Sequence, residues 1–255
     1  MYVQYLAQKN LHPRDKCITF DEEPHIYTIN GDSEFTSVTT WNHSHFDKFD
    51  SDKIINNMMK SHKWSQHKLF GKTKEEILQI WDTNKVNSAN AGTKLHYDIE
   101  CYYNEQPSNN SSLEYSYFLN FQQDFNNLTP YRTEWMVYDE ELRMAGSIDM
   151  IYKKDDGHLL IYDWKRCKDI SKFSRFNKFS NNPIICDFPD TNFWHYSLQL
   201  NTYKAILERC YGEIVDDLYL VCLHPDNKSK NYERIKVPNL QNQVKELFDE
   251  RIKNL

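Results

Sequence analysis

The sequence of 255 residues predicts an α/β (α+β) protein, and three features support this prediction. Residues 129–165 contain three strand-like runs separated by short turns, as in a set of antiparallel strands. Residues 217–223 (DLYLVCL) form a nearly continuous apolar run, which is typical of a buried strand. Several other stretches repeat their apolar residues at helical spacing. We therefore expect strands and helices to pack around one core in a single domain.

Composition, net charge and cysteine spacing exclude several classes of protein. Aromatic residues make up 15% of the chain and glycines number only 6, which does not fit a disordered protein. The net charge of −6 gives no overall attraction to nucleic acid, so DNA binding would need a local basic region. The six cysteines form no CxxC pair, which favours reduced thiols. No window approaches the roughly 18 apolar residues of a membrane span, so we expect a soluble intracellular protein.

The chain is expected to open with a β-hairpin. Residues 16–40 alternate apolar and polar positions around Asn30-Gly31, a pair that favours a tight hairpin turn. The region that follows is rich in histidine, but none of these residues has a ligand spacing such as HExxH. We therefore expect four surface histidines: His43, His45, His62 and His67.

Six stretches are expected to be helices: 51–63, 72–84, 93–104, 113–128, 192–209 and 239–254. Thr73 is the expected N-cap of the second helix. The small residues SANAG at 88–92 predict a turn between the second and third helices. The segment PSNNSS at 107–112 predicts a loop before the fourth helix.

The third predicted helix brings a histidine and a carboxylate together. His96 and Glu100 are four residues apart and therefore share one helical face. Such a pair can add ligands to a nearby metal ion. An ordinary surface pair without function explains the same spacing, so the sequence leaves both interpretations open.

The region from Met144 to Lys168 contains the chemistry of greatest interest. Two strand-like runs flank an Asp-Gly turn, and they carry Asp149 and Asp163. Adjacent strands can bring these carboxylates together, and crowded carboxylates usually imply a cation. Glu134 lies on the strand before this pair.

Asp163 and Lys165 are two residues apart, so they share one face of their strand, while Trp164 points to the other face. Oxygen ligands suit Mg²⁺ or Mn²⁺, and a neighbouring lysine suits a phosphate oxygen or a metal-activated water. The pattern indicates metal-assisted phosphodiester hydrolysis. The alternative is an ordinary hairpin whose charged residues are solvated.

Two further features fit nucleic-acid binding. Basic residues alternate with Phe173, Phe176 and Phe179 after the lysine strand, and such a region can contact phosphates and stack on bases. A solvated loop is the alternative. Gln199 and Tyr203 share one face of the helix at 192–209, either as site residues or as a polar edge and a core tyrosine. The basic residues are Arg166, Lys168, Lys172, Arg175 and Lys178.

Taken together, these motifs resemble the RecB-like branch of the PD-(D/E)XK nuclease superfamily, which includes lambda-type exonucleases. GTKLHYDIE resembles the family's histidine helix, AGSIDMI its G-x-x-D strand, LLIYDWK its (D/E)xK strand, and QLNTY its QxxxY helix. The resemblance spans roughly residues 90–225, and the hairpin FDEEPHIYTINGDSEFTSVTT is similar to that of viral and phage members.

The resemblance implies a restriction-endonuclease-like core, a central mixed sheet flanked by helices, in a single nuclease domain over 1–255. Residues 1–88 would be the N-terminal hairpin and helical decoration, and 89–225 the catalytic core. It also implies site roles. One or two Mg²⁺ or Mn²⁺ ions would be bound by Asp149, Asp163, His96 and the backbone carbonyl of Trp164, and Lys165 would be catalytic. A second metal or a water would be held by Glu100 or Glu134. The lysine loop or the DNA backbone would be positioned by Gln199 and Tyr203.

The expected activity is a metal-dependent deoxyribonuclease, preferably an exonuclease acting in DNA recombination, repair or replication on single- or double-stranded DNA. An endonuclease of the same fold and a nucleic-acid-binding module that no longer cleaves are the alternatives. The cysteine spacing does not reproduce the family's iron–sulfur pattern, so we expect no cluster. The chain has no Walker lysine motif, so a recombination or helicase partner would be a separate chain, and a homo-oligomer is also left open.

Overall fold

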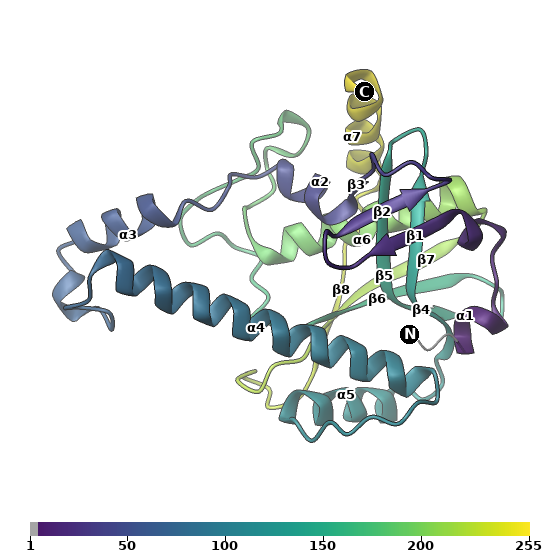
Figure 1. Cartoon of the computed structure of the whole chain (residues 1–255), viewed down its shortest axis with the longest axis horizontal. Helices are drawn as coiled ribbons and strands as arrows, with labels where there is room; N and C mark the ends of the chain where they lie inside the picture. The colour runs from purple at the N-terminus through teal and green to yellow at the C-terminus, as the bar shows by residue number, and fades with distance from the viewer. Residues whose placement is uncertain (1–4) are drawn as a thin grey trace.

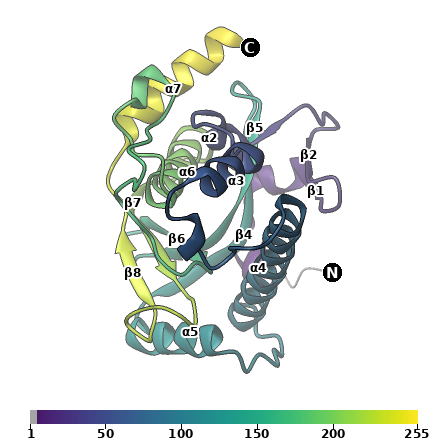
Figure 2. The same cartoon turned by 90° about the vertical axis from the view of Figure 1, so that its left-hand side faces the viewer.

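The structure, a computed structural model, describes residues 5–255. Residues 1–4, which belong to the expected N-terminal decoration at 1–88, lie outside the described part. Residues 5–255 contain a six-stranded mixed sheet with helices on both faces (Figures 1 and 2). The predicted class, a central mixed sheet flanked by helices, is confirmed.

The strands are β1 (Ile18–Asp21), β2 (Ile26–Ile29), β3 (Thr36–Ser37), β4 (Thr129–Asp139), β5 (Met144–Lys153), β6 (Leu159–Lys165), β7 (Val215–Cys222) and β8 (Glu233–Lys236). The α-helices are α1 (Tyr5–Lys9), α2 (Val38–Ser44), α3 (Ser51–Lys60), α4 (Lys74–Tyr103), α5 (Leu113–Asp124), α6 (Asn192–Ile206) and α7 (Gln241–Asn254). Short 3-10 helices are η1 (Pro13–Cys17), η2 (Trp64–Gln66) and η3 (Pro183–Ile185), and a π-helical turn, η4 (Leu207–Tyr211), extends α6.

Strand β5 is the centre of the sheet. β4 pairs antiparallel along its whole length, and the opposite edge is shared by β3, at Met144 and Ala145, and by β6, from Met150 to Lys153. In the described part of the chain, no strand pairs with residues 146–149 along this second edge. β6 continues parallel to β7, and β8 closes the sheet. The second edge of β5 is therefore open in its middle.

The two faces of the sheet are covered by different helices. One core cluster joins the sheet to α2, α6, α7 and the hairpin formed by β1 and β2, and the other joins it to α4 and α5. Strand alternation divides β6 between these layers, because Ile161 belongs to the first cluster whereas Tyr162 and Trp164 belong to the second. Trp164 therefore packs away from Asp163 and Lys165, as the sequence predicts.

Residues 51–85 form a helical arm that extends from the body of the molecule (Figure 1). The arm consists of α3, η2 and the first half of α4. It has its own small hydrophobic cluster around Ile55, Leu69 and Ile77, separate from the two clusters of the sheet. Its conformation therefore depends on local packing.

The turn predicted at 88–92 is wrong, because α4 runs through these residues without interruption. Thr73 and Glu76 form a capping box that starts the helix. The arm cluster and the cluster beneath the sheet fix its two ends. Packing at both ends thus overrides the weak helix propensity of Ser88, Asn90 and Gly92.

The turn of the first hairpin is also misplaced in the sequence prediction. β1 and β2 are joined by residues 22–25, and Asn30-Gly31 forms the next tight turn. There Ile29 and Asp32 exchange backbone hydrogen bonds of 2.8 and 2.9 Å. Both turn residues have positive φ, 51° and 87°, as a type I′ turn requires. The dipeptide therefore indicates the turn type correctly but not the strands that it joins.

Other differences concern single elements and one side chain. α1, α2 and β8 are not among the predicted elements, and α5 ends at Asp124 rather than at residue 128. The expectation that His45 lies at the surface is wrong, because His45 is buried against Trp41. Within residues 5–255, no helix combines the length and the apolar character that a membrane crossing demands.

Replacing Gly92 with alanine tests the continuity of α4. An added Cβ would meet no atom within 4 Å, and Gly92 has no positive φ. Because alanine is the better helix former, Gly92→Ala should stabilise the protein by about 0.5–1 kcal/mol in urea unfolding. Gly212→Ala is the contrasting variant. Because Gly212 has φ 69°, this substitution should destabilise the protein. A destabilised Gly92→Ala would contradict a helix through 88–92.

Candidate active site

The site lies where β5 and β6 separate. Their ladder ends at Met150 and Tyr162, but β6 continues to Lys165 with β7 as its partner. The backbone N–H of Trp164 lies beyond the last residue pair of β5 and β6, and it donates to Asp149 Oδ2 at 2.9 Å. A carboxylate thus takes the place of a strand partner. This hydrogen bond places the Asp149 side chain against the backbone of β6.

Asp163 and Lys165 form an ion pair on one face of β6. The Nζ atom of Lys165 lies 2.7 Å from Asp163 Oδ2, although this buried oxygen accepts no directed hydrogen bond. Burial raises the pKa of Asp163 to about 6. Burial alone would lower the pKa of Lys165, but Asp163 and Asp149 outweigh it and raise that pKa, so the ammonium stays charged. The Lys165 ammonium also lies 4.6 Å from the centre of the Tyr196 ring.

Glu134 lies opposite Asp149 on the neighbouring strand. Thr133 pairs with Met150 and Trp135 with Ile148, which leaves Glu134 facing Asp149 between them. Side chains at such positions project from the same face of the sheet. Glu134 has φ 44°, a sparsely populated conformation inside a strand, and Ser147 Oγ donates to its Oε2 at 2.9 Å. The strained backbone and this hydrogen bond together direct the carboxylate into the site.

His96 completes a group of three ligands. Its Nδ1 lies 3.5 Å from Asp149 Oδ2, and ligand atoms of His96, Glu134 and Asp149 all fall within 4.8 Å of one another. Burial and the charge of Lys165 lower the pKa of His96 to about 4, although a hydrogen bond to the backbone of Trp164 opposes this. The imidazole is therefore neutral at physiological pH, which is the form that binds metal ions.

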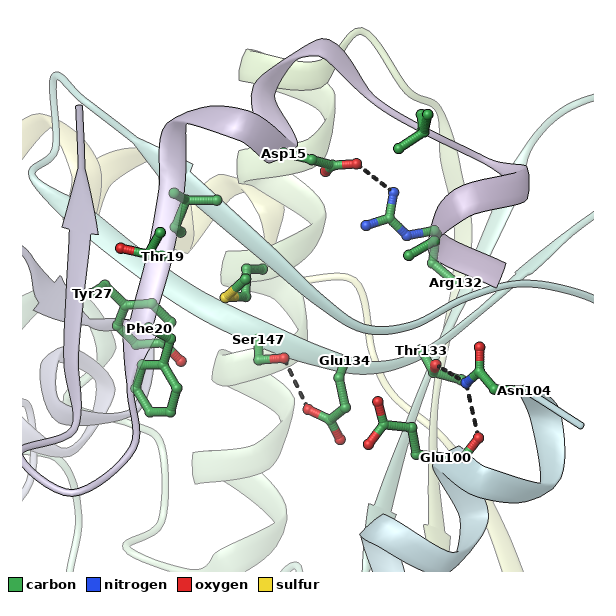
Figure 3. Close-up of a pocket in the computed structure, with 14 residues that line it drawn as sticks. Asp15, Thr19, Phe20, Tyr27, Glu100, Asn104, Arg132, Thr133, Glu134 and Ser147 are labelled. Atoms are coloured by element: carbon green, nitrogen blue, oxygen red, sulfur yellow. Dashed lines mark hydrogen bonds and ion pairs between the residues drawn. The ribbon is translucent and has the colours of Figure 1, made fainter. Parts of the chain in front are cut away.

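The carboxylates of the site are crowded. Burial, with the charge of Asp149, raises the pKa of Glu134 to about 8, and burial raises the pKa of Glu100 to about 7. The carboxyl groups of Glu100 and Glu134 point toward each other (Figure 3). Glu100 lies outside the group of three, and so does Asp163. A cation at this position would stabilise the charged form of these carboxyl groups, which burial disfavours.

Gln199 and Tyr203 lie together on α6 beneath the site. A hydrogen bond links Tyr203 to Gln199, and Tyr203 is only 3% exposed. The Tyr203 ring packs directly under Gly146, where a Cβ would come within 2.8 Å of its Cε1 and hydroxyl. Tyr203 therefore supports β5 from below, which fits a positioning role better than contact with DNA.

The basic residues after β6 do not share one environment. Arg166 donates to Glu114 of α5 at 2.7 Å, and Lys168 pairs with Asp226 at 3.2 Å. Lys172 lies 4.7 Å from the centre of the Phe193 ring, and Arg175 is exposed. Phe173 and Phe176 are more than 80% exposed. Lys172, Arg175 and the two phenylalanines are therefore more accessible to a ligand than Arg166.

A second cluster of possible ligands lies at the other end of β5 and β6. Asp156, His158 and Asp216 bring their ligand atoms within 4.8 Å of one another. Lys154 pairs with Asp156 at 2.9 Å and with Asp216 at 2.5 Å, so it neutralises much of the charge. Variants in this cluster are matched controls for the candidate site.

Two residues of the site are missed by the sequence reasoning. Ser147 orients Glu134, and Tyr196 lies against the Lys165 ammonium. Sequence signals for both exist. Ser147 is two residues before Asp149 on one strand, and Tyr196 precedes Gln199 and Tyr203 by three and seven residues on one helical face.

Comparison with known proteins gives only distant likenesses. No protein family and no curated protein matches the sequence. The crystal structure of SSO0001 is 14% identical with a TM-score of 0.38, and the alignment covers 100% of this chain and 86% of that one. The crystal structure of a "Putative exonuclease" from Eubacterium rectale is 10% identical with a TM-score of 0.37, covering 87% and 78% of the two chains. These low values do not establish a shared fold or activity.

Gly146→Ala tests the contact between β5 and Tyr203. Because Tyr203 is buried, its ring has little room to move, and the added methyl should destabilise the protein by about 1–3 kcal/mol in urea unfolding. Tyr203→Leu shortens the side chain beneath Gly146. In the double variant, Gly146→Ala should therefore add less destabilisation than it does alone. Strict additivity of the two changes would argue against this contact.

The pH dependence of the stability of Glu134→Gln tests the electrostatic cost of the site. The pKa of Glu134 is raised from 4.5 to about 8, so the protonated form stabilises the fold; this contribution is full below about pH 4.5 and is lost as the pH rises through 8. In EDTA, the free energy of unfolding of Glu134→Gln should gain at least about 1 kcal/mol over wild type between pH 5 and pH 8. The exposed Glu246→Gln on α7 should show no such gain. A pH-independent difference for Glu134→Gln would contradict the account.

Proposed function

We propose that the chain is a metal-dependent DNA nuclease that hydrolyses phosphodiester bonds, with an exonuclease role in DNA recombination, repair or replication. One observation carries the proposal. The ligand atoms of His96, Glu134 and Asp149 lie within 4.8 Å of one another where β5 and β6 separate, next to the segment of β6 that holds Asp163 and Lys165. Such a set of ligands beside a half-buried ammonium suits an anionic substrate better than a structural role.

The residues present fit a divalent cation. The carboxylate oxygens of Glu134 and Asp149 lie close together, and the neutral imidazole of His96 has a lone pair to offer. Carboxylate-rich donors with a single imidazole suit Mg²⁺ or Mn²⁺. Asp149, Glu134 and His96 would hold one ion, with Asp163 and the Trp164 backbone carbonyl as further ligands. A bound divalent cation would lower the pKa of a coordinated water and offset charge on the scissile phosphate.

The side chains have distinct roles in this proposal. Lys165 keeps its positive charge and offers N–H donors to a phosphate oxygen or to the attacking water. Asp163 orients the Lys165 ammonium through their 2.7 Å contact. Glu100, whose pKa is about 7, can take up or release a proton on its carboxyl group near neutral pH. His96 has a pKa near 4 and is therefore assigned to ligation rather than to proton transfer.

DNA would approach from the side of the basic segments. The chain as a whole carries −6, yet the arm at 51–85 has seven lysines against four carboxylates. Residues 166–179 have five basic residues against Asp169 alone. Phosphates would contact Lys172 and Arg175, with Phe173 and Phe176 available for stacking on bases. Gln199 and Tyr203 would position β5, the strand that carries Asp149.

Asp163→Asn and Lys165→Gln test the proposed site. Each variant should lower Mg²⁺- or Mn²⁺-dependent cleavage of DNA by at least about 10²-fold, because a ligand or a charge that stabilises the transition state is lost. Asp156→Asn and Lys154→Gln are matched controls in the cluster at the other end of β5 and β6, and they should cleave like wild type. Full activity of the purified Asp163 and Lys165 variants would refute the site.

The choice of substrate distinguishes the alternatives. Purified protein is incubated with end-labelled linear duplex, single strand and closed circular DNA in each metal. An exonuclease degrades the linear substrates from an end and leaves the circle intact, whereas loss of the circle indicates an endonuclease. Binding without any product across a metal titration indicates a module that no longer cleaves.

A further inference from the structure

A cavity of about 430 Å³ adjoins the proposed metal ligands (Figure 3). Glu134, Ser147 and Glu100 form the wall that it shares with the site. The opposite walls come from the hairpin of β1 and β2 and from α1 and the segment after it. We call this space the hairpin cavity. Its volume falls within the roughly 300–1,000 Å³ of small-molecule sites, so it can receive a part of the substrate next to the reacting phosphate.

The lining of the hairpin cavity does not favour a phosphate. Asp15, Glu100 and Glu134 bring three carboxyl groups to its lining. Among the lining residues of the described chain, Arg132 is the only one with a permanent positive charge, and its Nη1 is bound to Asp15 Oδ2 at 2.8 Å. Because Arg132 is already paired, the described lining has no free cation to compensate a phosphate, and an uncharged part of the substrate fits this space better.

The shape and chemistry of the lining suit a flat aromatic group. Phe20 and Tyr27 form an aromatic wall with ring centres 4.5 Å apart and planes tilted by 33°. Met136 and Ile18 add apolar surface. Thr19, with the Glu100 carboxyl group, supplies polar atoms at the edge of this surface. Stacking faces with polar atoms at their rim are the features that bind nucleobases.

Hydrogen bonds of Asn104 hold the base of the hairpin cavity in place. Asn104 Nδ2 donates to Thr133 Oγ1 at 2.8 Å and to the carbonyl of Glu100 at 2.9 Å, and Asn104 Oδ1 accepts from the N–H of Leu6 at 3.0 Å. These bonds tie α1 to α4 and β4. The cavity is therefore held open by buried hydrogen bonds rather than by loops.

We propose that the hairpin cavity binds the terminal nucleobase of the strand being cut, which places the last phosphodiester bond at the metal ligands. This inference rests on the proposed nuclease function and deepens it, because it names the end of a single or frayed strand as the substrate. A base inside a duplex is paired and stacked, and entry into the cavity would require it to be unpaired first.

Photo-crosslinking tests the inference without relying on cleavage. Oligonucleotides carry 5-iododeoxyuridine at the 3′ end, at the 5′ end or in the middle, and are irradiated with the 255-residue chain in Ca²⁺. Crosslinked peptides are identified by mass spectrometry. Crosslinks from one terminal position should map to Phe20 or Tyr27 of the hairpin, whereas the internal position should not reach them.

Ala7→Phe fills the hairpin cavity from α1, and Ala89→Phe makes the same change on an exposed face of α4. Ala7→Phe should abolish the terminal crosslink and weaken binding of a strand with a normal end by about fivefold or more, because the stacked base is lost. A strand with an abasic end should bind both variants and wild type alike. Ala89→Phe should match wild type, and circular dichroism confirms that both variants are folded.

The outcomes separate this inference from the proposed function. Terminal crosslinks at Phe20 or Tyr27 with no cleavage in any metal would support the cavity and overturn the nuclease. Metal-dependent cleavage with crosslinks outside the hairpin, or with equal binding of normal and abasic ends, would overturn the cavity and leave the nuclease standing. If Phe20→Leu keeps the fold and the terminal crosslink moves to Tyr27, the aromatic wall is the contact surface.

Discussion

The site depends on one hydrogen bond, from the backbone of Trp164 to the Asp149 carboxylate. β5 and β6 pair only as far as Met150 and Tyr162, and beyond that point a backbone donor needs a new partner. Asp149 supplies it, so the same carboxylate stabilises the separation of the strands and lies in the gap that the separation creates. Glu134, His96 and Lys165 are then brought to this gap by three different elements.

The buried carboxyl groups of the site lower the stability of the folded protein. Burial disfavours the charged form of these carboxyl groups, and neighbouring carboxylates add repulsion, so the pKa values of Glu134 and Asp163 are raised. Lys165 offsets part of the charge, and Tyr203 packs beneath Gly146 to keep β5 in place. Two well-packed clusters on the faces of the sheet supply the stability against which this penalty is set. Such an arrangement is typical of functional sites rather than of structural ones.

Sequence patterns predict the local elements well and their three-dimensional partners less well. Alternation along 159–165 correctly places Trp164 on one face and Asp163 with Lys165 on the other. The turn at 88–92 is not formed, because distant packing holds α4 straight. From the sequence, Glu134 is expected only as a residue that could hold a second metal or a water. Its place opposite Asp149 depends on the register of β4 and on a positive φ, neither of which has a local sequence signal.

The central claim is that His96, Glu134 and Asp149 hold a divalent cation. Calorimetric titration of Mn²⁺ into the wild type and into single variants at neutral pH tests it directly. The account predicts that wild type binds Mn²⁺ and that Asp149→Asn and His96→Ala weaken binding at least about tenfold, since each removes a ligand. Asp156→Asn should bind like wild type. Unchanged binding in the Asp149 and His96 variants, or loss of binding in Asp156→Asn alone, would contradict the claim.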